Sequence, residues 1–390
     1  MTCPRIDTDY LSAQLERLLA TPSPSGYTDN IVRYVSGELE RLGLDISVTR
    51  RGAILAVYRG REREGARAIV THLDTLGATV KSIKDNGRLE LVPIGTWSAR
   101  AAETTRCTLF TDEGTFRGTI LPLKASGHTF NEEIDTQGVG WRHVELRVDA
   151  DCHDRASAEA HGIRIGDFVA IDPGTELLDN GYIVSRHLDD KAGCAAMLAA
   201  MKAMCDEKVE TPVDIHFIFT ITEEVGSGAS AVLLDNVVAM VSIDNGTTAP
   251  GQNSAEFGVT IAMADQVGPF DYHLTRKLIR LCEANDIRHQ RDVFRYYRSD
   301  SASALEGGAD VRTALITFGV DASHSYERIH LHALKSIAEL VVLYAASPVE
   351  IARDVEELAD LEGFTAQPDQ PAPHSIEDAS EGQTENRPGS

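Results

Sequence analysis

Two adjacent carboxylates, Glu223 and Glu224, follow a largely apolar run that extends from Ile215 to Ile221. A Gly-Ser-Gly-Ala-Ser segment comes directly afterwards, at residues 226–230. This pattern predicts a buried strand that delivers both glutamates into the crevice where open α/β sheets bind ligands. Because successive residues point in different directions, one glutamate can hold a metal ion while the other accepts a proton. An exposed acidic turn is the simpler interpretation of such a pair taken alone.

Further candidate ligands stand at other strand or helix ends. Carboxylate and imidazole groups suit zinc, cobalt or manganese, and a set without cysteine fits a catalytic site better than a structural one. Five ligands are too many for one tetrahedral ion with an open position, but they suit two ions that share a bridging carboxylate. The candidates are His72, Asp189, Glu224, Asp244 and His324.

Each of these signals is weak by itself. A histidine at a strand end is more often a satisfied core residue than a ligand, and a pair such as Asp189-Asp190 before a helix is usually an N-cap. The order of the set carries the prediction: His-x-Asp, Asp-Asp, Glu-Glu, Asp and then His. We therefore expect a hydrolase that works with two divalent ions.

The composition excludes several classes of partner. The chain has 390 residues, of which 42% are hydrophobic and 25% charged, as in ordinary globular proteins. Its formal net charge of -23 repels phosphate backbones and anionic lipid, so we expect neither nucleic-acid nor membrane binding. The first residues lack the apolar core of a signal peptide, which predicts a cytoplasmic location. The six cysteines show no Cys-x-x-Cys spacing, so no cysteine zinc site is expected.

The hydrophobic pattern predicts an α/β domain interrupted by a small β-barrel. Helical spacing and buried strands alternate near both ends of the chain, with Phe168–Ile171 read as the first strand after the interruption. Between them, short strand-like pieces are punctuated by Gly, Asn and Asp. We predict a discontinuous catalytic domain (1–76 and 167–350), an inserted barrel domain (77–166), a terminal helix or linker (351–366) and a disordered acidic tail (367–390).

Four motifs, taken in order, resemble those of the tetrahedral aminopeptidases, a family of dinuclear zinc peptidases also called glutamyl or deblocking aminopeptidases. The resemblance runs from about Asp9 to Tyr344, and it includes a β-rich insertion after the first motif. It implies an α/β fold with a mixed-sheet, zinc-aminopeptidase-like catalytic domain that carries helices on both faces. The motifs are His72-Leu73-Asp74 with Gly77, Leu188-Asp189-Asp190-Lys191-Ala192-Gly193, Thr222-Glu223-Glu224-Val225-Gly226 and Ser242-Ile243-Asp244.

Two further stretches, residues 121–128 and 294–300, are similar to a narrower branch of bacterial peptidases. That branch is associated with the N-acetylglutaminylglutamine amide osmoprotectant system. The association implies a genomic context and does not identify a substrate.

The resemblance implies a role for each candidate ligand. Asp189 would bridge two divalent ions, with zinc favoured over cobalt or manganese. His72 and Asp244 would complete one site, and Glu224 and His324 would complete the other.

The same resemblance implies roles for three neighbouring carboxylates. Glu223 would be the general base that takes a proton from the bridging water and passes it to the leaving amine. Asp74 would accept a hydrogen bond from His72 and so orient the ring. Asp190 would follow Asp189 through a cis peptide bond.

The chain departs from the family pattern at the last histidine. The family usually shows Arg-Tyr-x-His-Ser there, whereas this chain reads Ala-Ser-His-Ser-Tyr at residues 322–326. Measured back from the final helix, His324 fits the ligand position better than His330, but both stay candidates.

These features predict a dinuclear metal-dependent aminopeptidase that removes N-terminal residues from short peptides. A metal-dependent deacylase or amidohydrolase acting on an acylated dipeptide or osmolyte is the alternative, because the same metal site serves both reactions. A glycosidase needs a carboxylate pair without metal, and a non-catalytic binding protein would have lost Glu223 or a ligand. The resemblance also implies a homo-oligomer, for which the family offers the tetrahedral dodecamer.

Overall fold

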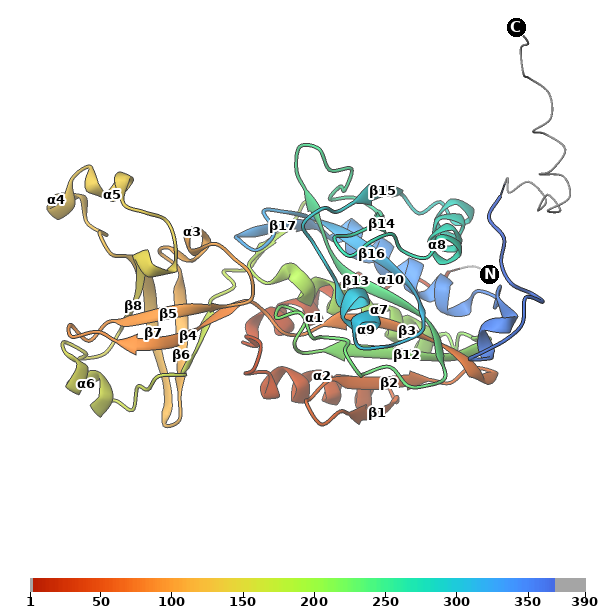
Figure 1. Cartoon of the computed structure of the whole chain (residues 1–390), viewed down its shortest axis with the longest axis horizontal. Coiled ribbons are helices and arrows are strands. Elements are labelled where there is room, and N and C mark those ends of the chain that lie inside the picture. The colour runs from red at the N-terminus through yellow and green to blue at the C-terminus, as the bar shows by residue number, and fades with distance from the viewer. Residues whose placement is uncertain (1–2, 369–390) are drawn as a thin grey trace, which may run out of the picture. The chain divides into compact units, whose positions relative to one another are not determined.

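The computed structural model describes residues 3–368 of the chain (Figure 1). The chain divides into two compact units, Met1–Pro348 and Val349–Ser390. The first unit contains all the predicted ligands, and the remaining paragraphs on the fold concern it alone.

The second unit was predicted to hold a terminal helix or linker at 351–366. Its described part contains one short 3-10 turn, η2 (Ala352–Val355), at that place. The predicted acidic tail, 367–390, lies outside the described residues except for its first two positions.

A mixed sheet forms the core of the α/β part. In the described chain it has eleven strands, in the order β1-β2-β12-β3-β13-β16-β17-β11-β10, with β14 beside β16 and β15 beside β14. The four neighbours β12, β3, β13 and β16 run parallel, and the outer pairs are antiparallel except β14 with β15. The strands are β1 (Asp45–Val48), β2 (Ile54–Tyr58), β3 (Glu62–His72), β10 (Glu176–Leu177), β11 (Tyr182–Ser185), β12 (Val213–Thr220), β13 (Val237–Thr248), β14 (Val259–Ala264), β15 (His289–Val293), β16 (Arg312–Asp321) and β17 (Glu327–His330).

The central strands have the sequence that parallel strands need. All eight residues of β12 are buried, because helices or loops cover both faces of a parallel sheet. Its apolar side chains divide between the two faces: Phe217 and Phe219 belong to the main core, whereas Ile218 packs with Ala68 and Val70 on the opposite face. This double burial explains the near-continuous apolar run in the sequence.

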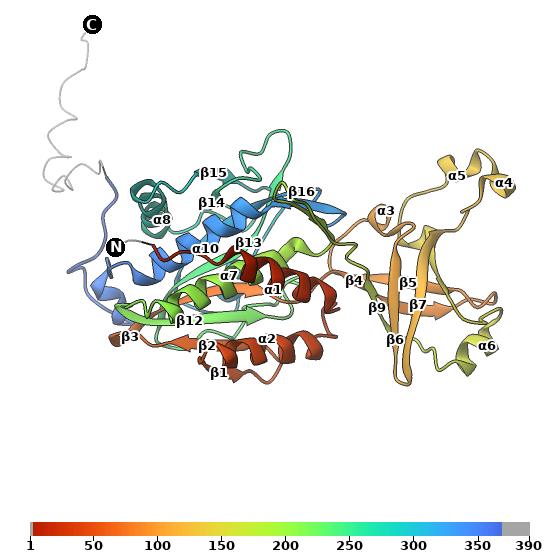
Figure 2. The same ribbon diagram turned by 180° about the vertical axis from the view of Figure 1, so that it is seen from behind.

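Helices cover both faces of the sheet. Figure 2 shows α1, α7 and α10 on one face, and α9 packs against β13 and β16 on the other. Among the described helices, none combines the length and hydropathy that a membrane crossing needs. The helices are α1 (Thr8–Ala20), α2 (Asp29–Arg41), α7 (Leu188–Asp206), α8 (Tyr272–Ala284), α9 (Asp300–Glu306) and α10 (Leu331–Ala346).

The segment between β3 and β10 forms a closed six-stranded barrel, in the order β4-β5-β8-β7-β6-β9. Its last strand corrects one expectation, because Phe168–Ile171 closes the barrel against β4 and β6 instead of joining the main sheet. A short apolar run such as Phe-Val-Ala-Ile fits a strand of either sheet, so the sequence pattern could not assign this strand. The barrel elements are β4 (Gly77–Ile83), β5 (Leu89–Ile94), α3 (Ala99–Ala102), β6 (Arg106–Thr111), β7 (Gly114–Pro122), α4 (Gly127–Phe130), α5 (Glu133–Thr136), η1 (Trp141–His143), β8 (Val144–Val148), α6 (Arg155–Ala160) and β9 (Phe168–Ile171).

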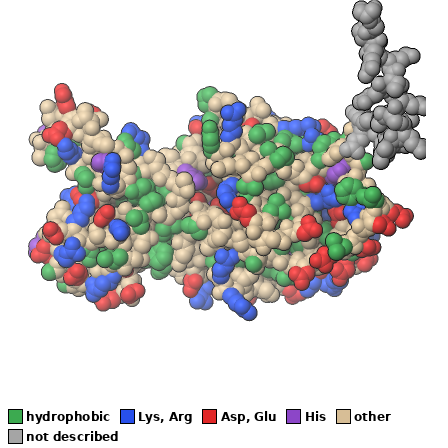
Figure 3. Space-filling view, in the orientation of Figure 1, with side chains coloured by type: hydrophobic (Ala, Val, Ile, Leu, Met, Phe, Trp, Pro, Cys, Tyr) green, Lys and Arg blue, Asp and Glu red, His purple; other side chains and the backbone are tan. Residues whose placement is uncertain are grey.

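Charged side chains of both signs are interspersed over the face shown in Figure 3, with hydrophobic side chains between them. Such a mixed surface is ordinary for a globular protein, because apolar atoms contribute much of any folded surface. This face therefore does not mark a binding site by its charge, and the candidate site is defined by buried groups.

Candidate metal centre

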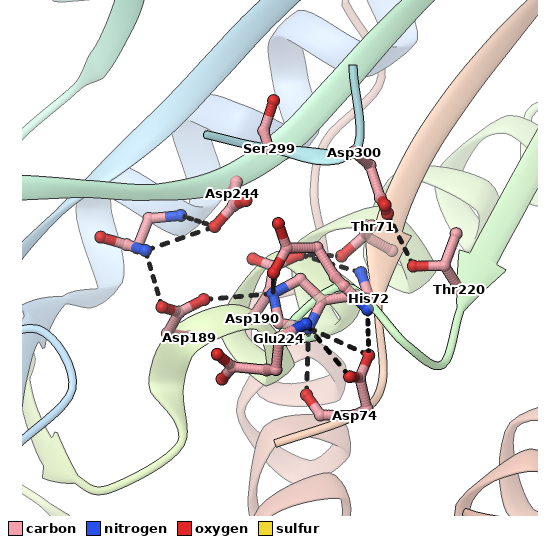
Figure 4. A network of polar contacts seen from close by, with 12 residues as sticks. Thr71, His72, Asp74, Asp189, Asp190, Thr220, Glu224, Asp244, Ser299 and Asp300 are labelled. Atoms are coloured by element: carbon pink, nitrogen blue, oxygen red, sulfur yellow. Dashed lines mark hydrogen bonds and ion pairs between the residues drawn. The ribbon is translucent and has the colours of Figure 1, made fainter. Parts of the chain in front are cut away.

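Parallel pairing brings the first motifs to one level of the sheet. His72 ends β3 and pairs with Thr220, the last residue of β12, so Glu223 and Glu224 lie just beyond the same edge. On the other side of β3, Ser242 of β13 pairs with Val70. Two residues further along both strands, Asp244 lies level with His72, and Figure 4 shows these side chains close together.

Asp189 lies between the two histidines. Its Oδ1 is 3.2 Å from His72 Nε2, and its Oδ2 is 3.2 Å from His324 Nε2. The amide of Asn245 donates a 2.7 Å hydrogen bond to the same Oδ2. A carboxylate with one oxygen turned to each histidine has the geometry of a bridge between two sites.

The ligand atoms fall into two clusters. His72, Glu223 and Asp244 form one, and Asp189, Glu224 and His324 form the other, with all atoms of each cluster within 4.8 Å of one another. Glu224 Oε2 lies 3.7 Å from His324 Nε2 in the second cluster. Each cluster thus brings histidine and carboxylate donors near enough to hold one ion.

Asp74 lies beneath both clusters and is fully buried. Its carboxylate accepts hydrogen bonds from the backbone N–H of Glu223 at 3.1 Å and of Glu224 at 3.2 Å. Ser25 Oγ donates a third, at 2.5 Å. His72 Nδ1 is 3.0 Å from the backbone carbonyl of Asp74 and 3.5 Å from its carboxylate. Asp74 therefore has two roles. Its side chain holds the Glu223-Glu224 turn in place, and its backbone carbonyl orients the His72 ring.

A second buried carboxylate, Glu327, fixes the other cluster. It accepts from the backbone N–H of His324 at 2.9 Å, and from those of Leu188 at 2.8 Å and Asp189 at 3.3 Å. The backbone carbonyl of Thr96 lies 2.8 Å from His324 Nδ1. This contact leaves Nε2 of the ring turned toward Asp189.

The peptide bond between Asp189 and Asp190 is cis. Asp190 is buried below the centre, where Thr71 Oγ1 and the backbone N–H of His72 donate to its Oδ2. A Cβ on Gly193 would come within 2.2 Å of Asp190 Oδ1. The glycine of this motif therefore leaves room for a carboxylate that supports β3 and its terminal histidine.

Burial and mutual repulsion shift the pKa values of the clustered carboxyls upward. Burial raises the pKa of Glu224 to about 8, against the opposing charge of His324. Burial, followed by the charge of nearby Asp244 and other carboxylates, raises the pKa of Glu223. Burial together with the charge of Asp189 does the same for Asp244. Carboxyl groups buried this close together need a nearby cation to balance their negative charge when they are ionised.

The neighbouring carboxylates also shift the pKa values of the histidines. Burial opposes the charged form of His324, but Asp189 and Glu224 outweigh it and raise its pKa to about 10. Burial likewise opposes ionisation of Asp189, yet His324 and His72 lower its pKa below the usual range. The donor set of imidazoles and carboxylates fits zinc, cobalt or manganese.

All seven predicted site residues lie in or beside the two clusters. They are His72, Asp74, Asp189, Glu223, Glu224, Asp244 and His324. The competing histidine, His330, lies elsewhere: its Nδ1 caps α10 by accepting from His332 N–H, and its Nε2 faces the carbonyl of Asn180. The individual ligand roles stay predictions.

Sequence reasoning missed several residues that support the site. Glu327 and Thr96 lie in no motif that the sequence makes recognisable. Their contacts with His324 depend on the folding of the barrel and of the last strand. Asp300 accepts from Thr220 Oγ1 at 2.6 Å and from Ala229 N–H at 2.7 Å, which ties down both ends of the Glu-Glu segment. The sequence offers one clue to this region: Ser299, directly before Asp300, is a typical N-cap residue, and it caps α9.

The fold and the buried carboxylate-histidine clusters are those of a metal-dependent peptidase. The family model described as M42 glutamyl aminopeptidase matches residues 52–340. The chain is also 34% identical over 336 residues to "Putative aminopeptidase YhfE" of Bacillus subtilis (strain 168), a match that covers 86% of this chain and 97% of that protein. The chain belongs to the M42 glutamyl aminopeptidase family and is a metallo-aminopeptidase of that class.

Solved structures agree on the fold. A TET aminopeptidase from a marine sediment archaeon of the Thaumarchaeota superposes with a TM-score of 0.81 at 19% identity, covering 91% of this chain and 99% of that one. The TET1 peptidase of Pyrococcus horikoshii, described as assembling into a tetrahedron or a large octahedral shell, gives a TM-score of 0.76 at 22% identity, with 86% and 99% covered.

Proposed function

We propose that this chain is a dinuclear metal-dependent aminopeptidase that removes N-terminal residues from short peptides. The observation that carries the proposal is Asp189, whose two oxygens each lie 3.2 Å from a different histidine. His72 and Asp244 would complete one site with it, and Glu224 and His324 would complete the other. Two divalent ions held there, zinc by preference, would polarise the scissile carbonyl and lower the pKa of a water molecule.

The chain's own residues would then manage the proton. Glu223 Oε2 lies 3.9 Å from His72 Nε2, so its carboxylate stands at the edge of the centre. As general base, Glu223 would take a proton from the attacking water and pass it to the leaving amine. The hydrogen bond from Glu223 N–H to Asp74 would hold that carboxylate in place.

Metal content and substrate class test this proposal together. We expect elemental analysis of reconstituted protein to give two divalent ions per chain, and chelation with EDTA to abolish activity reversibly. The assay should cover aminoacyl p-nitroanilides, short peptides and acetylated dipeptide amides. Faster cleavage of the acetylated compounds would favour a deacylase, and EDTA-resistant activity on a glycoside would favour a glycosidase. Fewer than two ions in fully loaded protein would contradict the dinuclear site.

We also propose that the chain assembles as a homo-oligomer. The support is the similarity to TET peptidases, one of which is described as forming a tetrahedron. Light scattering at micromolar concentration should give a mass that is a multiple of the 42.4 kDa chain, with twelve copies for a tetrahedral particle. A monomer at that concentration would contradict the proposal.

A further inference from the structure

One cationic side chain beside the second ligand cluster has no partner. Arg186 lies between β11 and α7, and it lines a cavity together with Asp189, Glu224 and His324. Its side chain is half-buried, and its Nε is fully buried without a hydrogen bond to any described residue. Nor does its guanidinium form an ion pair with a described carboxylate. Buried charges are almost always paired, so this arginine needs a physical explanation.

The guanidinium is held in place by contacts that do not satisfy its donors. It packs over the ring of Tyr326, with its Cζ 4.9 Å from the ring centroid. The Tyr326 hydroxyl donates to the carbonyl of Gly174, and the backbone N–H of Arg186 donates a 2.8 Å hydrogen bond to the carbonyl of Pro173. Stacking engages the face of a guanidinium and leaves the N–H donors at its edge free. Those donors match the two oxygens of a carboxylate.

The cavity joins this cation to the candidate metal centre. Three of its lining residues supply the donor atoms of the second cluster, so a peptide bound to that cluster would border the same space. Burial lowers the pKa of Arg186, and the charges of Tyr326, Asp172 and Glu327 offset only part of that shift. An arginine nevertheless stays cationic, and the anionic groups of an unmodified peptide are carboxylates. The apolar walls of the cavity are Leu76, Trp97 and Ile171.

We propose that Arg186 is a specificity-determining residue that binds a carboxylate of the peptide substrate. The proposal rests on the aminopeptidase function proposed above. Two carboxylates can fill this role: the side chain of an acidic N-terminal residue, or the C-terminal carboxylate of a dipeptide. Either would pair with the planar guanidinium through two parallel N–H···O bonds. Such a contact holds substrate and transition state alike, so it should lower KM more than it raises kcat.

The test uses two pairs of compounds, and the members of each pair differ only in one carboxylate. Glutamyl and glutaminyl p-nitroanilide differ at the end of the side chain, and leucyl-alanine and its amide differ at the C-terminus. We expect the unaltered protein to prefer the carboxylate in at least one pair by about 10–100-fold in kcat/KM, as a hydrogen bond to a charged group provides. The pair that shows the preference identifies which carboxylate Arg186 binds.

Three variants assign that preference to the guanidinium. Arg186→Met should bring the carboxylate compound down to the rate of its neutral partner, while the neutral partner stays within about twofold. Arg186→Lys keeps the charge but not the planar fork, so it should retain part of the preference. Arg276→Met is the matched control, because Arg276 also packs over a tyrosine ring, with its Cζ 4.5 Å from the centroid of Tyr272, but does not line this cavity. It should leave every rate within about twofold.

Several outcomes would overturn the assignment. Equal losses by Arg186→Met on both members of each pair would show that Arg186 only supports the structure. An unaltered protein without a carboxylate preference in either pair would contradict the proposal directly. If the Met variant fails to fold, Arg186→Gln supplies a second uncharged side chain for the same measurements. Failure to cleave any of the four compounds would contradict the proposed function instead. The intact compounds then serve as ligands in calorimetry, where a carboxylate preference that Arg186→Met abolishes would support the binding site and its absence would overturn it.

Discussion

Replacing Glu223 by Gln should leave the fold and both metal ions in place and lower kcat by about 10²–10⁴-fold, the usual value of a general base. Gln keeps the shape of the side chain but cannot accept a proton from water. The backbone hydrogen bond from residue 223 to Asp74 is unaffected, so the turn should stay intact. The measurements are steady-state kinetics and metal content on the same preparation.

Glu224→Gln is the matched control for this prediction. The two residues are adjacent and acidic, and both donate their backbone N–H to Asp74, but their carboxylates lie in different clusters. We expect Glu224→Gln to lose metal first and to regain part of its activity in excess ion. Because Glu223 also lies within reach of His72 and Asp244, loss of metal from Glu223→Gln would identify it as a ligand. Retention of metal by both variants with unchanged rates would place the site elsewhere.

The sequence predicts elements whose burial follows from their own hydrophobic pattern. The apolar run before Glu223 predicted a central strand, because a parallel strand covered on both faces needs apolar residues throughout. Helix α8 (Tyr272–Ala284) follows an equally simple rule, since its apolar residues repeat with helical spacing. Parallel pairing brings His72 of β3 and Asp244 of β13 to the same level of the sheet, whereas their assignment to one metal site was implied only by the family resemblance.

Features that depend on long-range contacts were beyond the sequence. The strand Phe168–Ile171 is found as a short apolar run, but its membership of the barrel depends on pairing with β4 and β6. Glu327 looks like an ordinary surface glutamate in the sequence, yet its carboxylate binds three backbone N–H groups around the second cluster. Residues of this kind are identified by what surrounds them.

Asp189 gives the second large expectation, because it is shared between the two clusters. In Asp189→Asn, the side chain loses its charge and one oxygen acceptor while nearly keeping its volume. We expect both ions to be lost, where Asp244→Asn or Glu224→Gln should each lose one. Removing the shared carboxylate also leaves His72 and His324 without their main partner, so their pKa values should fall toward the ordinary range.

The metal stoichiometry of these three variants is the decisive measurement. Elemental analysis after dialysis should give two ions for the unaltered chain, one for Asp244→Asn and for Glu224→Gln, and none for Asp189→Asn. Activity should follow occupancy, with excess zinc restoring the two single-site variants better than Asp189→Asn. The reason is geometric. Among the described side chains, Asp189 alone places one carboxylate oxygen 3.2 Å from His72 Nε2 and its other oxygen 3.2 Å from His324 Nε2. One ion retained tightly by Asp189→Asn would show that the two sites are independent and that Asp189 is no bridge.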